Sequence, residues 1–175
     1  MATYKIDASH SDVTFKVKHL MISSVTGHFN TYDSTLEVEG ENLTTAKISF
    51  EANVDSIDTK NEQRDGHLKS DDFFNAEQFP KLTFSSSSIS KTSVSEFTVT
   101  GDLTIRDVTK SVELSAEYNG QTKDPWGMER MGFEISGKIN RSDFGLKWGA
   151  LTEAGGVVLG DDVKLSINAE FIKQA

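Results

Sequence analysis

The chain has 175 residues, with 27 acidic and 18 basic side chains and a formal net charge of −9. This acidic balance argues against nucleic acid as a partner, because a phosphate-binding face is basic. The absence of cysteine excludes disulfides, thiolate metal sites and cysteine nucleophiles. Eleven phenylalanines and a hydrophobic share of 36% indicate a folded chain, and the length suits one domain over residues 1–175.

The sequence shows no targeting or membrane-spanning segment. Residues 1–11 lack the basic region and the apolar region of a signal peptide. No run approaches the roughly 18 consecutive apolar residues of a membrane helix. We therefore expect a cytoplasmic protein with no integral membrane segment, while noting that a secreted chain trimmed of its signal would read the same.

Alternation of apolar and polar residues dominates the chain from its start. This period of two is typical of strands with one buried face, and it predicts about eight strands. Residues 27–38 also alternate, but Phe29 and Leu36 differ in parity, so we expect one long strand with a bulge there. In chain order, the predicted strands cover 13–19, 27–38, 47–54, 82–84, 97–105, 112–118, 133–139 and 163–171.

Two longer connections interrupt this pattern. Residues 58–80 lack the period of two, and 61–68 and 70–75 read as short helices, the second with Ser70 as its N-cap. Residues 145–160 contain five glycines and predict a flexible loop. The remaining turns are short, which predicts that neighbouring strands pair antiparallel.

Eight such strands fit either a sandwich or a closed barrel. The long strands and hairpin connections favour the barrel, so we expect an all-β fold, an eight-stranded antiparallel barrel with a short helical excursion between strands 3 and 4. A barrel of about eight strands either fills its interior with side chains or holds one small ligand. The pattern leaves both interpretations open, because a packed and a hollow barrel share the same alternation. Several phenylalanines have inward parity: Phe15, Phe29, Phe50, Phe84, Phe97, Phe133 and Phe171.

Candidate chemistry is sparse. The four histidines form no compact metal-binding spacing, so we expect no metal site. No nucleophile elbow, phosphate loop or dinucleotide fingerprint occurs, so we expect no enzyme and no cofactor. His19 continues the inward parity of its strand and is either a core histidine or a contact for a ligand head group. Arg64, Asp65 and His67 crowd one helical turn and favour a role in tying that helix to the barrel, with a head-group contact as the alternative.

Short blocks of sequence resemble those of a known family. In chain order they are Tyr4-Lys5-Ile6-Asp7, Gly27-His28-Phe29, Arg64-Asp65-Gly66-His67-Leu68-Lys69-Ser70, Phe79-Pro80-Lys81-Leu82-Thr83-Phe84, Gly101-Asp102-Leu103-Thr104-Ile105-Arg106 and Ile139-Asn140-Arg141-Ser142-Asp143-Phe144-Gly145-Leu146. Through these blocks the chain resembles the YceI-like family, and in particular its shorter cytoplasmic members. One departure is Asp107, where the family turn usually carries glycine; aspartate tolerates left-handed geometry.

The resemblance implies an extended, lipocalin-like eight-stranded antiparallel barrel. The same resemblance implies a long cavity for a polyisoprenoid or another long-chain amphiphile, such as an isoprenoid pyrophosphate, a fatty acid or a fatty amide. It also implies that a homodimer can form. We expect a non-catalytic protein that transports, stores or sequesters such a lipid. The alternatives are a structural or stress-related module with a filled barrel and, more remotely, a lipid-modifying enzyme.

The expected ligand-binding residues fall into three groups. His10, His19 and Arg64 would contact the head group, and Trp148 in the glycine-rich loop would belong to a lid. The expected tunnel wall consists of Phe15, Val17, Phe29, Phe50, Phe84, Leu103, Phe133 and Ile135.

Overall fold

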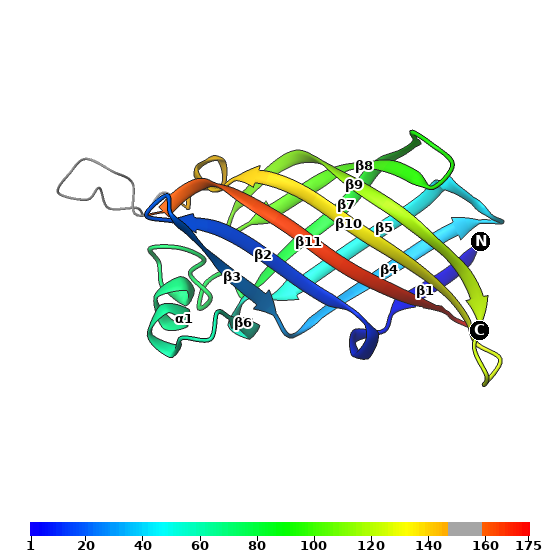
Figure 1. The fold of residues 1–175 in the computed structure, drawn as a ribbon, viewed down its shortest axis with the longest axis horizontal. Helices are drawn as coiled ribbons and strands as arrows, with labels where there is room; N and C mark the ends of the chain where they lie inside the picture. The colour runs from blue at the N-terminus through cyan, green and yellow to red at the C-terminus, as the bar shows by residue number, and fades with distance from the viewer. Residues whose placement is uncertain (147–158) are drawn as a thin grey trace.

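The structure, a computed structural model, describes residues 1–146 and 159–175. Within them the chain forms an elongated antiparallel barrel with one α-helix at one end and both termini at the other (Figure 1). The strands are β1 (Ala2–Ile6), β2 (Asp12–His19), β3 (Ser23–Phe29), β4 (Tyr32–Glu39), β5 (Asn42–Asn53), β6 (Ile57–Asp58), β7 (Lys81–Lys91), β8 (Glu96–Ile105), β9 (Val108–Lys123), β10 (Glu129–Asn140) and β11 (Leu159–Lys173). The helix is α1 (Glu62–Lys69), and the 3-10 turns are η1 (Ala8–His10), η2 (Val54–Ser56) and η3 (Arg141–Phe144).

Eight strands close the barrel. The ring runs β1-β4-β5-β7-β8-β9-β10-β11 and returns to β1. The carboxyl end of β11 pairs with β1, whereas its amino-terminal part pairs with β2. β1 and β2 therefore pair with different halves of β11 and together fill one place in the barrel wall. On their other side, β4 pairs with β1 and β3 pairs with β2. The predicted eight-stranded antiparallel barrel is confirmed, and α1 is the expected helical excursion.

The expectation of one bulged strand over residues 27–38 is wrong. The chain leaves the sheet after Phe29 and starts a new strand at Tyr32. At the break, the Asn30 N–H donates to the Ser56 carbonyl (3.1 Å), and the Asn53 N–H donates to the Thr31 carbonyl (2.9 Å). The parity changes because β3 and β4 are separate strands, each aligned with a different half of the β1/β2 pair.

The second predicted helix, over residues 70–75, is also wrong. These residues form turns, and the Ser70 hydroxyl donates to the His67 carbonyl (2.5 Å) at the end of α1. Ser70 therefore ends the first helix and does not begin a second one. The predicted helix over 61–68 corresponds to α1, whose N-cap is Asn61: its side chain accepts a hydrogen bond from the Arg64 N–H (3.0 Å).

The turn between β8 and β9 holds the residues that follow α1 against the barrel. Arg106 donates to the carbonyls of Asp71 (2.9 Å) and Phe73 (3.1 Å), and its guanidinium lies 5.6 Å from the centre of the Phe79 ring. Arg106 is also the left-handed residue of the turn, with φ 55°, whereas the sequence had suggested Asp107 for that geometry. The turn thus holds the α1 segment against this end of the barrel.

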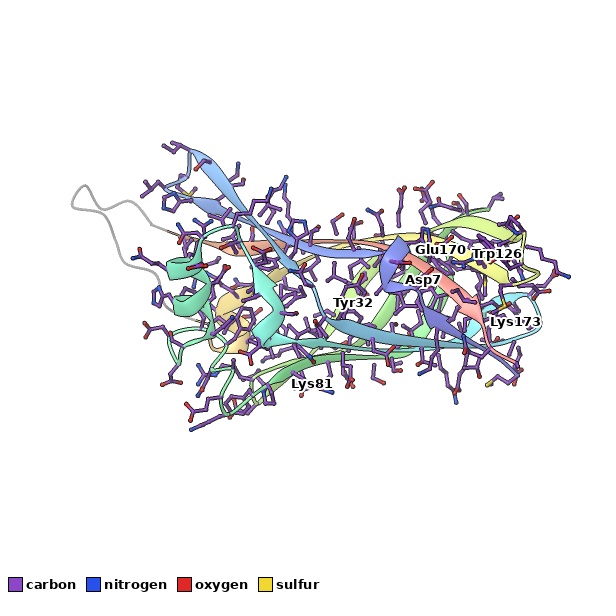
Figure 2. All side chains as sticks on the ribbon, turned by 90° about the horizontal axis from the view of Figure 1, so that it is seen from below. Asp7, Tyr32, Lys81, Trp126, Glu170 and Lys173 are labelled. Atoms are coloured by element: carbon purple, nitrogen blue, oxygen red, sulfur yellow. The ribbon has the colours of Figure 1, made fainter. Side chains whose placement is uncertain are left out.

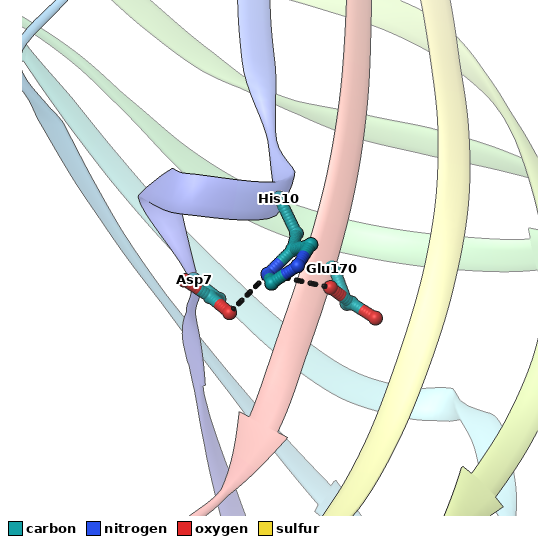
Figure 3. A group of neighbouring side chains, drawn as sticks. All are labelled: Asp7, His10 and Glu170. Carbon is teal, nitrogen blue, oxygen red and sulfur yellow. Dashed lines mark hydrogen bonds and ion pairs between the residues drawn. The ribbon is translucent and has the colours of Figure 1, made fainter. Parts of the chain in front are cut away.

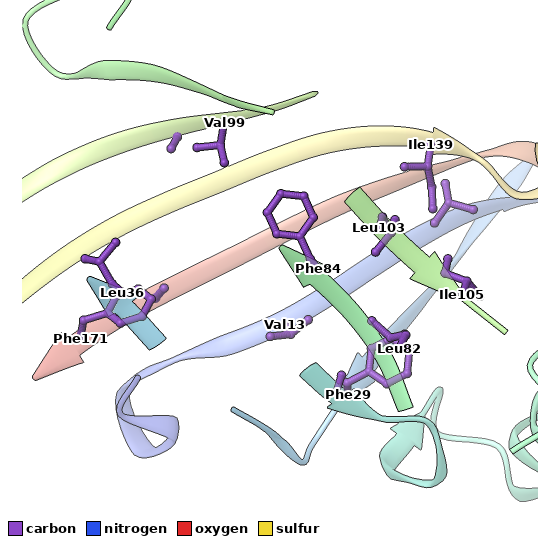
Figure 4. Close-up of a cluster of buried hydrophobic side chains, with 14 of the residues drawn as sticks. Val13, Phe29, Leu36, Leu82, Phe84, Val99, Leu103, Ile105, Ile139 and Phe171 are labelled. Atoms are coloured by element: carbon purple, nitrogen blue, oxygen red, sulfur yellow. The ribbon is translucent and has the colours of Figure 1, made fainter. Parts of the chain in front are cut away.

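The inward side chains form one continuous apolar cluster (Figure 4). Leu36 and Val38 are each only 1% exposed, and Phe171 is 3% exposed. Other inward residues are only half-buried although they face the barrel interior, among them Phe15, Phe50 and Phe133. Partial exposure of inward aromatic rings indicates space inside the barrel. Among the described residues, no helix is both long and apolar enough to span a membrane.

Candidate ligand-binding cavity

The barrel encloses a cavity of about 570 Å³, which lies within the usual range for small-molecule sites. Its lining follows the strands over most of their length: β8 contributes inward residues from Phe97 to Ile105. A strand rises about 3.3 Å per residue, so these eight steps span roughly 26 Å along the strand. The cavity is therefore long, and its shape suits an extended molecule.

Aromatic and aliphatic side chains make up most of the wall. Nine of the eleven phenylalanines line the cavity: Phe15, Phe29, Phe50, Phe73, Phe74, Phe84, Phe97, Phe133 and Phe171. Neighbouring rings contact one another, with centroids 5.5 Å apart for Phe15 and Phe29 and 5.9 Å apart for Phe133 and Phe171. Burying apolar surface against such a wall is the main source of affinity for an apolar chain.

Glycines in the wall explain how these rings coexist with a cavity. Gly27 lies under the Phe15 ring and Gly101 under the Phe84 ring, so closely that a Cβ at either glycine would overlap the ring. A ring whose far end occupies the place of a missing Cβ lies against the wall, which leaves the centre of the barrel open. This arrangement, in which an aromatic ring shields a strand glycine, recurs in sheets that must curve.

The polar lining residues gather at the α1 end. They are His19, Asn61, Gln63, Arg64, His67 and Arg141. Two further polar residues lie along the barrel, but their hydroxyls donate within the wall: Thr14 to the Ser166 carbonyl (2.9 Å) and Ser34 to the Ser49 carbonyl (2.8 Å). Among the described lining residues none is aspartate or glutamate. The cavity thus has a long apolar body and one polar end that carries no acidic group in the described part of the chain.

Arg64 and Asp65 are adjacent in sequence and meet at the same threonine. The Asp65 carboxylate accepts from the Thr59 N–H (2.9 Å), while Arg64 donates through Nε to Thr59 Oγ1 (2.8 Å) and through Nη2 to the Thr59 carbonyl (2.6 Å). Thr59 is only 4% exposed, so this network fixes the start of α1 on the barrel. Arg64 therefore ties the helix to the barrel and also lines the cavity, while its contact with a head group stays a prediction.

His67 lies one helical turn after Arg64 and also reaches the cavity. Its Nε2 is 2.8 Å from Asp72 Oδ2, and its ring makes an edge contact with Phe73, with centroids 5.2 Å apart. The list of binding residues drawn from the sequence omits His67, although the i, i+3 spacing already places it on the same helix face as Arg64. Asn61, Gln63 and Phe73 also line the cavity and are absent from the expected binding residues. Asn61 and Gln63 belong to the start of α1, and Phe73 lies in the turns that follow it.

Arg141 is a buried cation at the end of β10, with 5% of its surface exposed. It donates to the carbonyls of Leu146 (2.7 Å) and Gly160 (2.9 Å), and Asp161 lies 3.9 Å away. Burial lowers the pKa of this guanidinium from its ordinary value. The alternation of apolar and polar residues gives no sign of a binding role for Arg141, because this residue follows the last residue of β10.

The structure places most of the expected binding residues on the cavity wall. Those that line it are Phe15, Val17, His19, Phe29, Phe50, Arg64, Phe84, Leu103, Phe133 and Ile135. Their position is established, while their role in binding stays a prediction. Trp148, expected in a lid, lies outside the described residues.

His10 is the exception and does not line the cavity. It ends η1 on the outer surface, where its Nδ1 lies 2.8 Å from Asp7 Oδ2 and 3.5 Å from Glu170 Oε2 (Figure 3). The side chain of His10 is 63% exposed. This corrects the expected head-group set to His19 and Arg64, with His67 beside them.

The Asp7, His10 and Glu170 ligand atoms lie within 4.8 Å of one another, a spacing that could suit a metal. However, Arg130 already contacts both carboxylates, with Nη1 2.8 Å from Asp7 and 3.5 Å from Glu170. Hydrogen bonds from Ser9, Arg130 and His10 hold the pKa of Asp7 well below its usual range. The cluster is a set of polar contacts that joins η1 and its N-cap Asp7 to β10 and β11 across the outside of the barrel.

A closed antiparallel barrel around a long apolar cavity defines a lipocalin-like protein. The family model of the YceI-like domain matches residues 4–171. A UPF0312 protein of Staphylococcus aureus (strain MSSA476) is 42% identical over 172 residues, which are 98% of this chain and 98% of that protein. The chain belongs to the YceI-like family, as its sequence blocks suggested.

Solved structures agree with this assignment. The YceI protein of Campylobacter jejuni is 34% identical, with a TM-score of 0.79 over 90% of each chain. BcnA of Burkholderia cenocepacia shares the fold at 21% identity, with a TM-score of 0.82 over 94% of this chain and 98% of that one. A polyisoprenoid binding domain from Saccharophagus degradans shares it at 15% identity, with a TM-score of 0.74 over 98% of both chains.

Proposed function

We propose that this protein is a non-catalytic carrier that holds a polyisoprenoid or another long-chain amphiphile in its barrel, for transport, storage or sequestration. The observation that carries the proposal is the long apolar cavity with its polar residues confined to the α1 end. In the proposed complex the tail lies along the barrel and the head group lies near His19, Arg64 and His67. The polyisoprenoid binding domain of Saccharophagus degradans, which has the same fold, supports this ligand class.

The tail supplies the affinity in this proposal. Each methylene transferred from water to an apolar site contributes about 0.8 kcal/mol before ordering costs are subtracted. In a tunnel lined by aromatic rings, the affinity rises with the length of the tail. Tails that differ in structure can still bind, because apolar contacts are non-directional. Selectivity therefore falls to the polar end.

The polar end favours a head group that accepts hydrogen bonds. Arg64 is cationic and donates, and the described lining residues include no carboxylate that would repel an anion. A carboxylate, a phosphate or an amide carbonyl fits this description. The net charge of −9 does not oppose such a ligand, since the acidic side chains do not line the described part of the cavity.

Binding without catalysis is supported by the chemistry of the lining. Arg64 and Arg141 donate to backbone carbonyls, and Arg64 also donates to the Thr59 hydroxyl. Cationic donors of this kind are suited to hold a ligand oxygen. The filled-barrel alternative is disfavoured by a cavity of about 570 Å³.

Extraction of the purified protein with organic solvent, followed by mass spectrometry, tests the proposal. We expect a long-chain lipid at close to one molecule per chain. The delipidated protein should then rebind a long polyprenol or a long-chain fatty acid, detected by native mass spectrometry, and a short-chain analogue should bind far more weakly. If neither extraction nor rebinding yields a stoichiometric lipid, the carrier proposal fails.

A further inference from the structure

The turn between β2 and β3 presents three consecutive apolar side chains to solvent. Leu20 is 39% exposed, Met21 is 65% exposed and Ile22 is 83% exposed. Leu20 and Met21 also adopt left-handed backbone angles, with φ 53° and 61°. Such a turn is better served by asparagine or glycine, so neither the backbone nor the core of this protein accounts for apolar residues here.

A row of lysines runs over the outer wall next to this turn. Lys16, Lys164 and Lys138 lie directly opposite one another across β2, β11 and β10, and Lys18 continues the row toward the turn. Like charges placed opposite one another destabilise a sheet. Asp162 is 3.4 Å from Lys138, but among the described residues no carboxylate forms an ion pair with Lys16, Lys18 or Lys164. A chain of net charge −9 therefore carries a local basic stripe beside an apolar tip.

We propose that this tip, Leu20 to Ile22, inserts into the interface of an anionic lipid bilayer while the lysine stripe contacts the head groups. Apolar side chains on a convex turn flanked by basic residues have the chemistry of an interfacial anchor. A protein partner fits less well, since a stable interface needs about 800 Å² on each side. The charge complementarity of the stripe selects an anionic bilayer over a neutral one.

The position of the tip connects the docking surface with the cavity. His19 lines the cavity at its polar end and directly precedes Leu20. Figure 1 places the β2–β3 turn and α1 at the same end of the barrel. A bilayer bound by the tip would therefore face the polar end of the cavity. The inference goes beyond the proposed carrier function, because it assigns the surface at which a lipid is exchanged.

The opposite end of the barrel also exposes apolar residues but lacks this charge pattern. Trp126 is 82% exposed there, and Figure 2 shows it at the end that carries Lys173. Its backbone N–H donates to Asp124, whose carboxylate also pairs with Arg130 at 2.8 Å. Lys173 pairs with Glu129 at 3.1 Å. Arg130 and Lys173 are thus paired with acidic groups, and Lys123 lies directly opposite Glu129 in the sheet, so Trp126 is exposed without a lysine row beside it and serves as a matched control.

Vesicle co-sedimentation of the delipidated protein tests the proposal. Phosphatidylcholine vesicles are compared with phosphatidylcholine vesicles that contain phosphatidylglycerol. We expect binding to the anionic vesicles alone, with loss at high salt. Ile22→Ser should weaken this binding about tenfold or more, as expected for removing a buried apolar side chain. Trp126→Ser should leave it unchanged, and Lys16→Glu with Lys164→Glu should weaken it and flatten its salt dependence.

Several results would overturn the proposal. These are no binding of the wild-type protein to anionic vesicles, equal loss with Trp126→Ser, or an effect of Ile22→Ser on self-association without an effect on vesicle binding. Ile22 is exposed, so the variant should keep the wild-type melting temperature. Lipid rebinding from detergent solution separates this test from the carrier proposal: Ile22→Ser should retain it, and vesicle docking can succeed or fail independently of it.

Discussion

The ring of Phe15 lies over Gly27, its direct partner across β2 and β3, and a side chain at position 27 would overlap that ring. The Phe84 ring covers Gly101 across β7 and β8 in a similar way, although this contact is diagonal, since the direct partner of Phe84 is Leu103. In both pairs a missing Cβ lets a large ring lie along the wall instead of across the barrel. The width of the cavity therefore depends on two glycines that line no part of it themselves.

Gly27→Ala should narrow the cavity. All three nearest atoms to a Cβ at this position belong to the Phe15 ring, so the ring must turn toward the centre of the barrel. We expect weaker binding of long-chain lipid in a titration of the delipidated protein, with a loss of stability of about 1–3 kcal/mol from overpacking. Adding Phe15→Leu should restore binding. Failure of that second change to restore binding would argue against ring displacement.

Gly101→Ala should cost more stability than Gly27→Ala. A Cβ at position 101 would overlap the Ser85 carbonyl oxygen as well as the Phe84 ring, and backbone atoms cannot turn aside as a ring can. Urea unfolding of both variants measures the difference. Equal stability losses would contradict the distinction between side-chain and backbone overlap.

Ile135→Trp should block the cavity with little change in melting temperature. Ile135 faces the cavity, so an indole there can occupy empty volume instead of displacing packed neighbours. The matched control is Ser136→Trp, which adds the same side chain at the next, exposed position of β10. Binding of a long-chain lipid should fall only in the first variant. If Ile135→Trp lowers stability by 1–3 kcal/mol and the control does not, the barrel is filled, as overpacking predicts.

The outer ion-pair cluster predicts loss of stability in acid. Ser9, Arg130 and His10 hold the pKa of Asp7 below its usual range, so the unfolded chain, with a carboxyl pKa near 3.9, takes up the proton first. The contribution of Asp7 is therefore fully present above about pH 4 and is lost as the pH falls toward the folded-state pKa. Asp7→Asn should lower the melting temperature at pH 7 and make progressively less difference below pH 4.

The exposed Asp33 provides the control for this experiment. It lies 4.0 Å from Lys5, and both side chains are 54% exposed, so Asp33→Asn should change the melting temperature little at any pH. A constant gap between wild type and Asp7→Asn from pH 7 to pH 3 would show that packing, not charge, explains the effect of Asp7.

Arg141→Lys should destabilise the barrel although the charge is kept. The Arg141 guanidinium donates to the carbonyls of Leu146 and Gly160 through two different nitrogens. Lysine has one terminal nitrogen on a shorter side chain, so it cannot reproduce both hydrogen bonds. Losing charge-assisted hydrogen bonds at a buried site costs roughly 2–3 kcal/mol. Urea unfolding should show this loss, whereas Lys138→Met, at an exposed position, should change stability by less than about 0.5 kcal/mol. If Arg141→Lys leaves the free energy of unfolding almost unchanged, Arg141 does not stabilise the barrel through these hydrogen bonds.

Much of the cavity wall was predictable because strand parity is local. Phe15, Val17 and His19 share one face of β2 whatever the rest of the chain does, since successive side chains alternate. The break between Phe29 and Tyr32 was not predictable in the same way, because it depends on hydrogen bonds to Ser56 and Asn53, which are distant in sequence. His10 was misplaced for a similar reason: besides the local Asp7, it lies beside Glu170, which comes from the other end of the chain.

The sequence by itself determined the alternating strands, the barrel class, the position of α1 and the family. These features follow from local periodicity and short motifs, which can be recognised whatever the register of the sheet. Only the tertiary structure decided that the barrel is hollow and that its polar residues meet at one end. A cavity is the difference between the volume enclosed by the closed sheet and the volume of the side chains that point inward. That difference depends on the Phe15 ring occupying the place of a Cβ at Gly27 and the Phe84 ring the place of a Cβ at Gly101, and no local pattern encodes such contacts between strands.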